Sequence, residues 1–203
     1  HPAQDITNHH GTVNRLFDDG SVPPDNPFVG TSGARPEIWS YGHRNPQGLA
    51  IHPETGDIWV AEHGPQGGDE LNLILPGLNY GWPVIGYGVN YGSGLAIHEG
   101  TRGEGIESPQ HFWVPSIATS GLMIYTGDLF PAWRGSIFVG GLAGEQMARL
   151  TMEGQRVVRE ETLLQGLGRI RDIRQDSDGY IYVAIDGRGQ PSAVVRLEPA
   201  GAR

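Results

Sequence analysis

Residues 42–48 combine side chains that bind anions with the glycines of a loop. Arg44 offers a planar guanidinium to a carboxylate or quinone oxygen, and Asn45 adds a donor and an acceptor beside it. The alternative is that these polar groups only cap the backbone of a tight turn. The segment therefore indicates either an anion site or a capped turn that precedes a strand.

Residues 62–70 form a second polar segment, with three glycines, three acidic residues and one proline. Calcium takes about six to eight oxygen ligands from carboxylates and backbone carbonyls, and a glycine-rich loop beside acidic residues supplies both. The alternative is an acidic loop exposed to solvent. His63 in this loop is expected to bond to backbone at a strand end rather than to act as a base or a metal ligand.

Arg169 and Arg171 form the third candidate group. Residues i and i+2 of a strand project to one face, so both guanidinium groups can converge on one anion. The alternative is that one of them pairs with Asp172 or Asp176 at the surface. Residues 176–179 resemble a fragment of a calcium loop, but the pattern favours a simple hairpin turn.

Composition and missing motifs exclude several functions. With 23 acidic and 14 basic residues the formal charge is −9, which has the wrong sign for binding nucleic acid through its phosphates. Insertion into a membrane is not expected either, because no apolar run approaches the roughly 18 residues required. The chain has no cysteine and neither an H-E-x-x-H nor a G-x-S-x-G motif, so a zinc hydrolase or a serine esterase is unsupported.

The elements that must position these residues are short strands in a repeating order. Three strands rich in β-branched and aromatic residues are predicted at 57–61, 136–140 and 180–184, each after a glycine turn. Each turn follows an earlier strand, predicted at 48–51, 121–125 and 170–174. Fourth-strand candidates follow at 70–74, 147–150 and 193–197, and residues 11–16 carry a further copy of that candidate.

Four antiparallel strands per unit are the pattern of a β-propeller blade, with a β-sandwich as the main alternative. The all-β chain is predicted to cover about three blades plus the last strand of another. The spacing between the first two copies is longer, which predicts a Gly-rich insertion at about 77–115. Such insertions map to the loops of one face, often the binding face.

Four stretches together resemble the soluble, pyrroloquinoline quinone (PQQ)-dependent aldose sugar dehydrogenases, also called the glucose/sorbosone dehydrogenase family. They are residues 37–48, 62–70, 79–83 and 168–172, and the likeness extends over essentially all 203 residues. Members of that family are six-bladed β-propellers. The resemblance therefore implies that residues 1–203 are the C-terminal half of a single β-propeller domain, in a periplasmic or secreted protein.

The resemblance also assigns roles position by position. The residues expected to contact PQQ are Arg44, Asn45, Tyr91, Gly141, Leu142, Arg169 and Arg171. The groups expected to hold calcium are the carbonyls of Gly64 and Pro65 beside the quinone, and Glu70 with the Tyr80 carbonyl at a second, structural site.

The implied reaction oxidises an aldose sugar at C1 to a lactone and passes the electrons to an external acceptor. The family's histidine base lies in its N-terminal half and no residue here matches it, so we expect the isolated chain to be inactive. A missing N-terminal half or a second copy would complete the ring. Two alternatives stay open: a non-catalytic propeller fragment that binds carbohydrate or a protein partner, and a calcium-dependent lactonase.

The sequence contains no lysine, and all of its 14 basic residues are arginine. Well-known members of the family place a lysine in the loop beside PQQ, where this chain has Ala143. The resemblance therefore predicts weaker PQQ retention than in relatives that carry this lysine, with Arg44, Arg169 and Arg171 left to neutralise the acidic cofactor.

Overall fold

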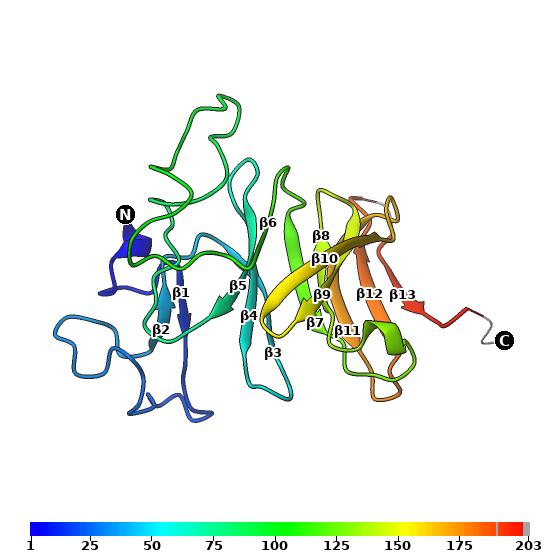
Figure 1. Ribbon diagram of the computed structural model, residues 1–203, viewed down its shortest axis with the longest axis horizontal. Coiled ribbons are helices and arrows are strands. Elements are labelled where there is room, and N and C mark those ends of the chain that lie inside the picture. The colour runs from blue at the N-terminus through cyan, green and yellow to red at the C-terminus, as the bar shows by residue number, and fades with distance from the viewer. Residues whose placement is uncertain (190, 201–203) are drawn as a thin grey trace.

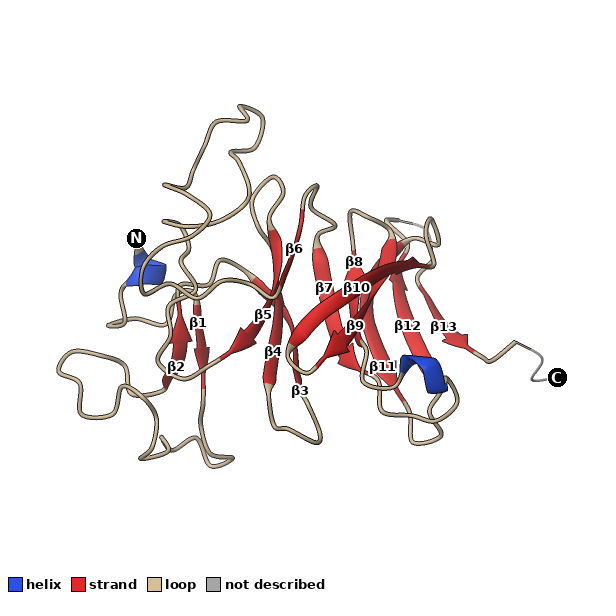
Figure 2. Ribbon diagram, in the orientation of Figure 1, coloured by secondary structure: helices blue, strands red, loops and turns tan. Residues whose placement is uncertain are grey.

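The computed structural model describes residues 1–189 and 191–200, and strands dominate it (Figure 2). The helical structure among these residues consists of two 3₁₀ turns of three residues each, Pro2–Gln4 and Pro131–Trp133. In this part of the chain no helix is long and apolar enough to cross a membrane. The all-β prediction is confirmed.

The strands of the described residues form four antiparallel sheets that stand side by side in a row (Figure 1). The first sheet has two strands, β1 (Thr12–Asn14) and β2 (Ile38–Tyr41). The second has four, β3 (Pro46–Ile51), β4 (Ile58–Glu62), β5 (Asp69–Ile74) and β6 (His111–Trp113). The third also has four, β7 (Thr119–Ile124), β8 (Ile137–Gly141), β9 (Gln146–Glu153) and β10 (Arg156–Leu163). The last has three, β11 (Arg169–Gln175), β12 (Ile181–Asp186) and β13 (Ala193–Leu197).

The first strands of successive sheets are neighbours, since β3 contacts β7 and β7 contacts β11. Sheets arranged in this way are successive blades of a β-propeller, and the β-sandwich alternative is wrong. The predicted strands are present, but those at 70–74, 147–150 and 193–197 are the third strands of their sheets and not the fourth. The fourth strands are β6 and β10. At the start of the chain, the single predicted strand is paired with β2, so this sheet shows two strands.

The cores lie between neighbouring sheets because central strands bury both faces. On β4, the side chain of Trp59 packs with those of β8 and β9, whereas Val60 packs toward Ile74 and Tyr80 on the other face. On β8, Val139 faces the second sheet and Phe138 faces the fourth. Alternation with a period of two along a strand thus supplies two cores at once. Burying an aromatic or aliphatic side chain of this kind contributes about 1.5–3 kcal/mol.

Residues 75–110, between β5 and β6, form the long loop segment that projects beyond the sheets in Figure 1. Isolated bridges tie it to β2, from Asn79 to Tyr41, and to the loop between β4 and β5, from Val89 to Gln66. The range 77–115 predicted as an insertion includes β6, which pairs with β5. The segment therefore rises over the same end of the sheets at which β4 ends and β5 begins.

Candidate cofactor site

Two buried carboxylates hold the loop between β4 and β5. Asp69, at the start of β5, is fully buried and accepts hydrogen bonds from the Gly64 N–H at 3.0 Å and the Ser116 hydroxyl at 2.8 Å. It also accepts one from the Thr119 N–H at 3.3 Å. Gly64 is packed so closely against the carbonyls of Gly67 and Gly68 that a Cβ there would overlap them. The interpretation of this segment as a solvent-exposed acidic loop is therefore wrong.

Glu62, the last residue of β4, is the second buried carboxylate. Its Oε1 accepts a hydrogen bond from His43 Nδ1 at 2.8 Å, and its Oε2 accepts one from the Arg44 N–H at 2.7 Å. Burial by itself raises the pKa of Glu62. The His43 ring and the backbone donors lower this pKa by more than burial raises it, so the net shift is downward. The Glu62 carboxylate therefore lies inside the protein with several hydrogen-bonding partners around it.

The Arg44 side chain lies in a defined place at the end of the same sheet. Its guanidinium carbon is 5.1 Å from the centre of the Trp82 ring, and its Nη1 donates to the His63 carbonyl at 3.3 Å. His63 Nε2 lies 2.5 Å from the Thr119 carbonyl, so the expectation that this histidine bonds to backbone is confirmed. Asn45 is exposed beside the His63 ring, with 3.4 Å between its Nδ2 and His63 Nδ1.

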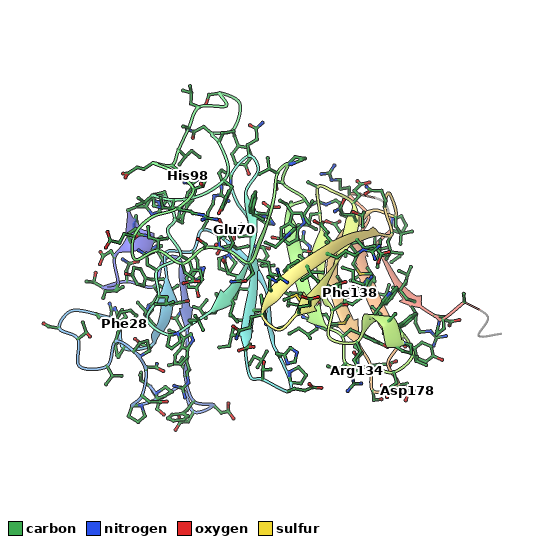
Figure 3. All side chains as sticks on the ribbon, viewed as in Figure 1. Phe28, Glu70, His98, Arg134, Phe138 and Asp178 are labelled. Carbon is green, nitrogen blue, oxygen red and sulfur yellow. The ribbon has the colours of Figure 1, made fainter. Side chains whose placement is uncertain are left out.

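A small cavity brings five of the residues assigned from the sequence together. It has a volume of about 20 Å³. Among its lining residues are Arg44, Gly64, Pro65, Glu70 and Tyr80. A cavity needs about 10–15 Å³ to hold one water molecule, so this one has room for a single water or ion. Figure 3 shows Glu70 at this end of the sheets, below the loop that carries His98.

The electrostatics of Glu70 favour a cation in this cavity. Burial, reinforced by the neighbouring charges of Glu62 and Asp69, raises the pKa of Glu70 to about 8. Asn72 donates to it at 3.1 Å, while the Asn72 side-chain oxygen is buried without a partner. A hard cation that takes oxygen ligands would stabilise both groups: the Glu70 carboxylate, which lies close to two other acids, and the Asn72 oxygen, which has no donor.

A larger groove lies next to this cavity and shares Pro65 with it. The groove has a volume of about 510 Å³, and Tyr91, Ala143 and Val114 are among its lining residues. The Tyr91 ring is 68% exposed, yet its hydroxyl donates to the Pro65 carbonyl at 3.0 Å. The groove falls in the size range of cofactor sites, about 300–1,000 Å³.

Arg169 and Arg171 converge on one carboxylate, as their spacing predicted, but its owner is Asp186 on the neighbouring strand. Arg169 Nε is 3.2 Å and Arg171 Nη2 is 3.7 Å from the same Asp186 oxygen. The alternative pairing with Asp172 or Asp176 is wrong. Asp172 pairs with Arg174. The carboxylate of Asp176 accepts the N–H groups of residues 178 and 180, as a hairpin turn requires.

The arginines of the fourth sheet are linked to the β4–β5 loop of the second sheet by contacts through the third. Arg169 Nη1 donates to the Leu142 carbonyl at 3.3 Å, and Gly141 pairs with Thr119, whose carbonyl lies against His63. The contact chain therefore passes through three successive sheets. Asn45, Gly141, Leu142, Arg169 and Arg171 do not line the small cavity.

Several residues of the site were missed in the sequence. Glu62 and Asp69 belong to the segment assigned to calcium, but their burial carried no signal because acidic residues in glycine-rich loops are usually solvated. Trp82 was part of a resemblance motif without a role. Asp186 became visible only through the pairing of β11 with β12. Among the described residues, no three His, Asp or Glu side chains lie together as a metal site. A site whose ligands are mainly backbone carbonyls does not need such a group.

The chain is therefore a segment of an all-β propeller that carries arginines and a glycine-rich loop at one end of its strands. Over residues 1–196 the sequence matches the family Glucose / Sorbosone dehydrogenase, and the chain belongs to it.

Named relatives agree with this membership. Aldose sugar dehydrogenase YliI from Escherichia coli is 46% identical over 188 residues, which are 91% of this chain and 50% of that protein. A crystal structure of a glucose dehydrogenase superposes with a TM-score of 0.92 at 51% identity and covers 97% of this chain and 57% of that one. The PQQ-bound form of an aldose sugar dehydrogenase from Streptomyces coelicolor superposes with a TM-score of 0.76 at 29% identity, over 97% of this chain and 54% of that one.

The chain spans about half the length of the curated relatives it matches, 47% and 50% of the first two. Its sheets are accordingly part of a propeller ring, as the fold already indicated.

Proposed function

We propose that this chain is the cofactor-binding C-terminal half of a PQQ- and calcium-dependent dehydrogenase. The whole protein would oxidise aldose sugars at C1 to lactones and pass the electrons to an external acceptor. The observation that carries the proposal is the small cavity, where Arg44, Gly64, Pro65, Glu70 and Tyr80 lie together although they come from separate segments. The family membership and the PQQ-bound relative support the same function.

The residues present suit an acidic, planar cofactor. Arg171 is 49% exposed, and Arg169 uses only part of its five donors on Asp186 and Leu142, so both retain donors for cofactor carboxylates. Arg44 and Asn45 would bind from the second sheet, with Tyr91 against one side of the groove and Gly141 and Leu142 at its margin. When bound, PQQ would supply the acceptor for the hydride that leaves the sugar.

The metal proposal rests on residues with oxygen donors that line the small cavity, of which Pro65 also lines the groove. The Gly64 and Pro65 carbonyls would hold one calcium beside the cofactor, and Glu70 with the Tyr80 carbonyl would hold a second. The buried Glu70 carboxylate and the partnerless Asn72 oxygen support a cation in this region. The hydrogen bond from the Tyr91 hydroxyl orients the Pro65 carbonyl and leaves its second lone pair available.

The chain's own part in the reaction would be to bind and orient the cofactor. No residue here is assigned as the base that removes the proton from the C1 hydroxyl, so we propose that residues 1–203 alone do not turn over. A ring completed by an N-terminal half of the same protein would supply that base, and a second copy is the other candidate to complete it. The proposed location is periplasmic or secreted.

Calorimetric titration of PQQ into the chain, with calcium and with a chelator, tests the proposal. Binding that requires calcium and is weakened at least tenfold by Arg44→Ala is expected. Binding of calcium without PQQ would favour the lactonase alternative, and binding of neither would favour a non-catalytic fragment. Glucose-dependent dye reduction with PQQ and calcium is expected from the full-length gene product only, so robust turnover by the 203 residues alone would contradict the role proposed for the rest of the protein.

A further inference from the structure

The side chain of Arg44 and its backbone are both held by one pair of consecutive residues, Glu62 and His63. The Glu62 carboxylate accepts the Arg44 N–H at 2.7 Å, and the His63 carbonyl accepts a hydrogen from the Arg44 guanidinium at 3.3 Å. His63 also contacts Asn45, because its N–H donates to the Asn45 carbonyl at 3.0 Å. The end of β4 thus fixes the two residues that precede β3.

Glu62 is itself fixed from the opposite side. Its Oε1 accepts from His43 Nδ1 at 2.8 Å and from Asn72 Nδ2 at 2.9 Å. Both hydrogen bonds end on the same Glu62 oxygen, so two side chains hold it on this side. The other ring nitrogen of His43 lies 2.9 Å from the Ser40 hydroxyl, and the ring stacks on Tyr80 with centroids 4.5 Å apart.

The order serine, histidine, carboxylate is also that of a hydrolase triad, but these groups are sealed off. Ser40 is 0%, His43 1% and Glu62 3% exposed, so no substrate reaches the hydroxyl. Nucleophilic catalysis at Ser40 therefore does not explain the arrangement. The hydrogen bonds do reach the backbone of Arg44, a residue that lines the small cavity.

We propose that Glu62 is a positioning residue: it sets the backbone of Arg44 so that the guanidinium stays at the cofactor site, and His43 with Ser40 keeps the Glu62 carboxylate in place. This inference rests on the proposed function, because Arg44 is taken as a cofactor contact. Glu62 also lines the small cavity, and in this proposal its carboxylate acts through Arg44 rather than on the cofactor directly. Neutralising it leaves the Arg44 N–H with a weaker acceptor and sets an amide hydrogen against one of the present donors.

A double-mutant cycle with PQQ affinity as the readout tests this in the full-length gene product. Glu62→Gln is expected to weaken PQQ binding about tenfold in the wild-type background and less than twofold in an Arg44→Ala background, because the effect passes through Arg44. The matched control is Glu160→Gln. Glu160 also accepts from a histidine ring, His111 at 2.9 Å, and from the Trp113 indole at 2.9 Å, but it belongs to β10 and contacts β6. It should leave the PQQ affinity within twofold.

A second readout needs no cofactor. The Arg44 amide is expected to exchange with deuterium at least tenfold faster in Glu62→Gln than in wild-type or Glu160→Gln protein, all free of PQQ and metal. Should Glu62→Gln fail to fold, Ser40→Ala removes only the far end of the chain of bonds. It should weaken PQQ binding two- to threefold in the wild-type background and not at all with Arg44→Ala.

The outcomes separate the two proposals. Equal losses of affinity from Glu62→Gln in both backgrounds, or unchanged exchange at Arg44, would overturn the positioning role while PQQ binding by the wild type stands. If the wild type binds no PQQ, the proposed function fails, and the exchange rate of the Arg44 amide still decides whether Glu62 holds that residue.

Discussion

The β4–β5 loop and the β11–β12 edge hold their charges in opposite ways. In the loop, Asp69 is fully buried and receives donors from three different residues. At the edge, Asp186 is 37% exposed and serves two arginines with one oxygen. Arg171 is itself 49% exposed. One end of the proposed cofactor site is therefore built into the core, and the other lies at the surface.

The difference teaches which half of the site is formed in advance. If a buried carboxylate moves away, its hydrogen-bond donors remain buried without an acceptor, which costs about 1–3 kcal/mol for each unpaired group. Exposed ion pairs contribute only about 0–1 kcal/mol, so arginines can exchange such a partner for a ligand carboxylate. We therefore expect the loop to be fixed before PQQ binds and the arginines of β11 to adapt to it.

The largest effect is expected when the buried acid of the loop is neutralised. Asp69→Asn sets an amide hydrogen against the Gly64 N–H, the Ser116 hydroxyl or the Thr119 N–H, and should lower the free energy of unfolding by about 3 kcal/mol. Urea denaturation at neutral pH measures it. The control, Ser116→Ala, removes one donor and should lower that free energy by about 1 kcal/mol. Equal losses from the two variants would mean that Asp69 is not the anchor of the loop.

An intermediate effect is expected for Glu160, whose side chain is 29% exposed between β6 and β10. The hydrogen bond from His111 is the main cause that lowers the pKa of Glu160, with burial opposing it and Trp113 assisting. Because the folded pKa lies below the unfolded one, this stabilisation is present above pH about 4.5 and is lost as the pH falls through the folded value.

Glu160→Gln should therefore lower the free energy of unfolding by about 1 kcal/mol at pH 7. The difference from wild type should shrink in acid, below pH about 4.5. Urea titrations at several pH values measure both quantities. A gap between the two proteins that stays constant down to pH 3 would show that the carboxylate charge does not hold this joint.

A smaller and opposite effect is expected at the exposed edge. Asp186→Asn removes the carboxylate that competes with PQQ for Arg169 and Arg171, so PQQ binding should tighten about two- to fivefold, while the free energy of unfolding changes by less than about 0.5 kcal/mol. Asp178→Asn is the charge-matched control, since Asp178 lies at the other end of this sheet, far from Glu70 (Figure 3). Weaker binding by Asp186→Asn would mean that Asp186 orients the arginines more than it competes for them.

The sequence predicts the parts of this molecule that depend on local pattern. Enrichment in β-branched and aromatic residues located β4, β8 and β12, and glycine turns separated them from the strands before. The spacing of Arg169 and Arg171 correctly predicted one shared anion. Their partner was not predictable, because a bulge between Ile170 and Asp172 sets which residue of β12 faces them.

Burial was the other unpredictable quantity. Glu62 and Asp69 stand in a polar, glycine-rich segment that is typical of solvated loops. Their partners include residues distant in sequence, His43 for Glu62 and Ser116 with Thr119 for Asp69. The numbering of strands within the sheets was wrong because two fourth strands were not predicted: β6, which has only three residues and follows a long loop, and β10, most of whose residues are exposed. Local signals identify which residues carry chemistry, whereas partners and burial follow from tertiary packing.

The smallest effect is expected from a lysine introduced at Ala143, on the exposed side of the proposed cofactor site. Ala143 is exposed and lines the groove with Pro65 and Tyr91, so Ala143→Lys would place an ammonium beside the bound cofactor. In water a pair of unit charges 4 Å apart gains about 1 kcal/mol, and ordering the lysine side chain offsets part of it. PQQ binding by the full-length gene product should therefore tighten about twofold, as calorimetry at low salt can measure.

The neutral variant Ala143→Gln is the control for side-chain length. If it tightens binding as much as Ala143→Lys does, or if neither variant does, charge at this position does not set PQQ retention, and the absence of lysine from the chain has no consequence for the cofactor.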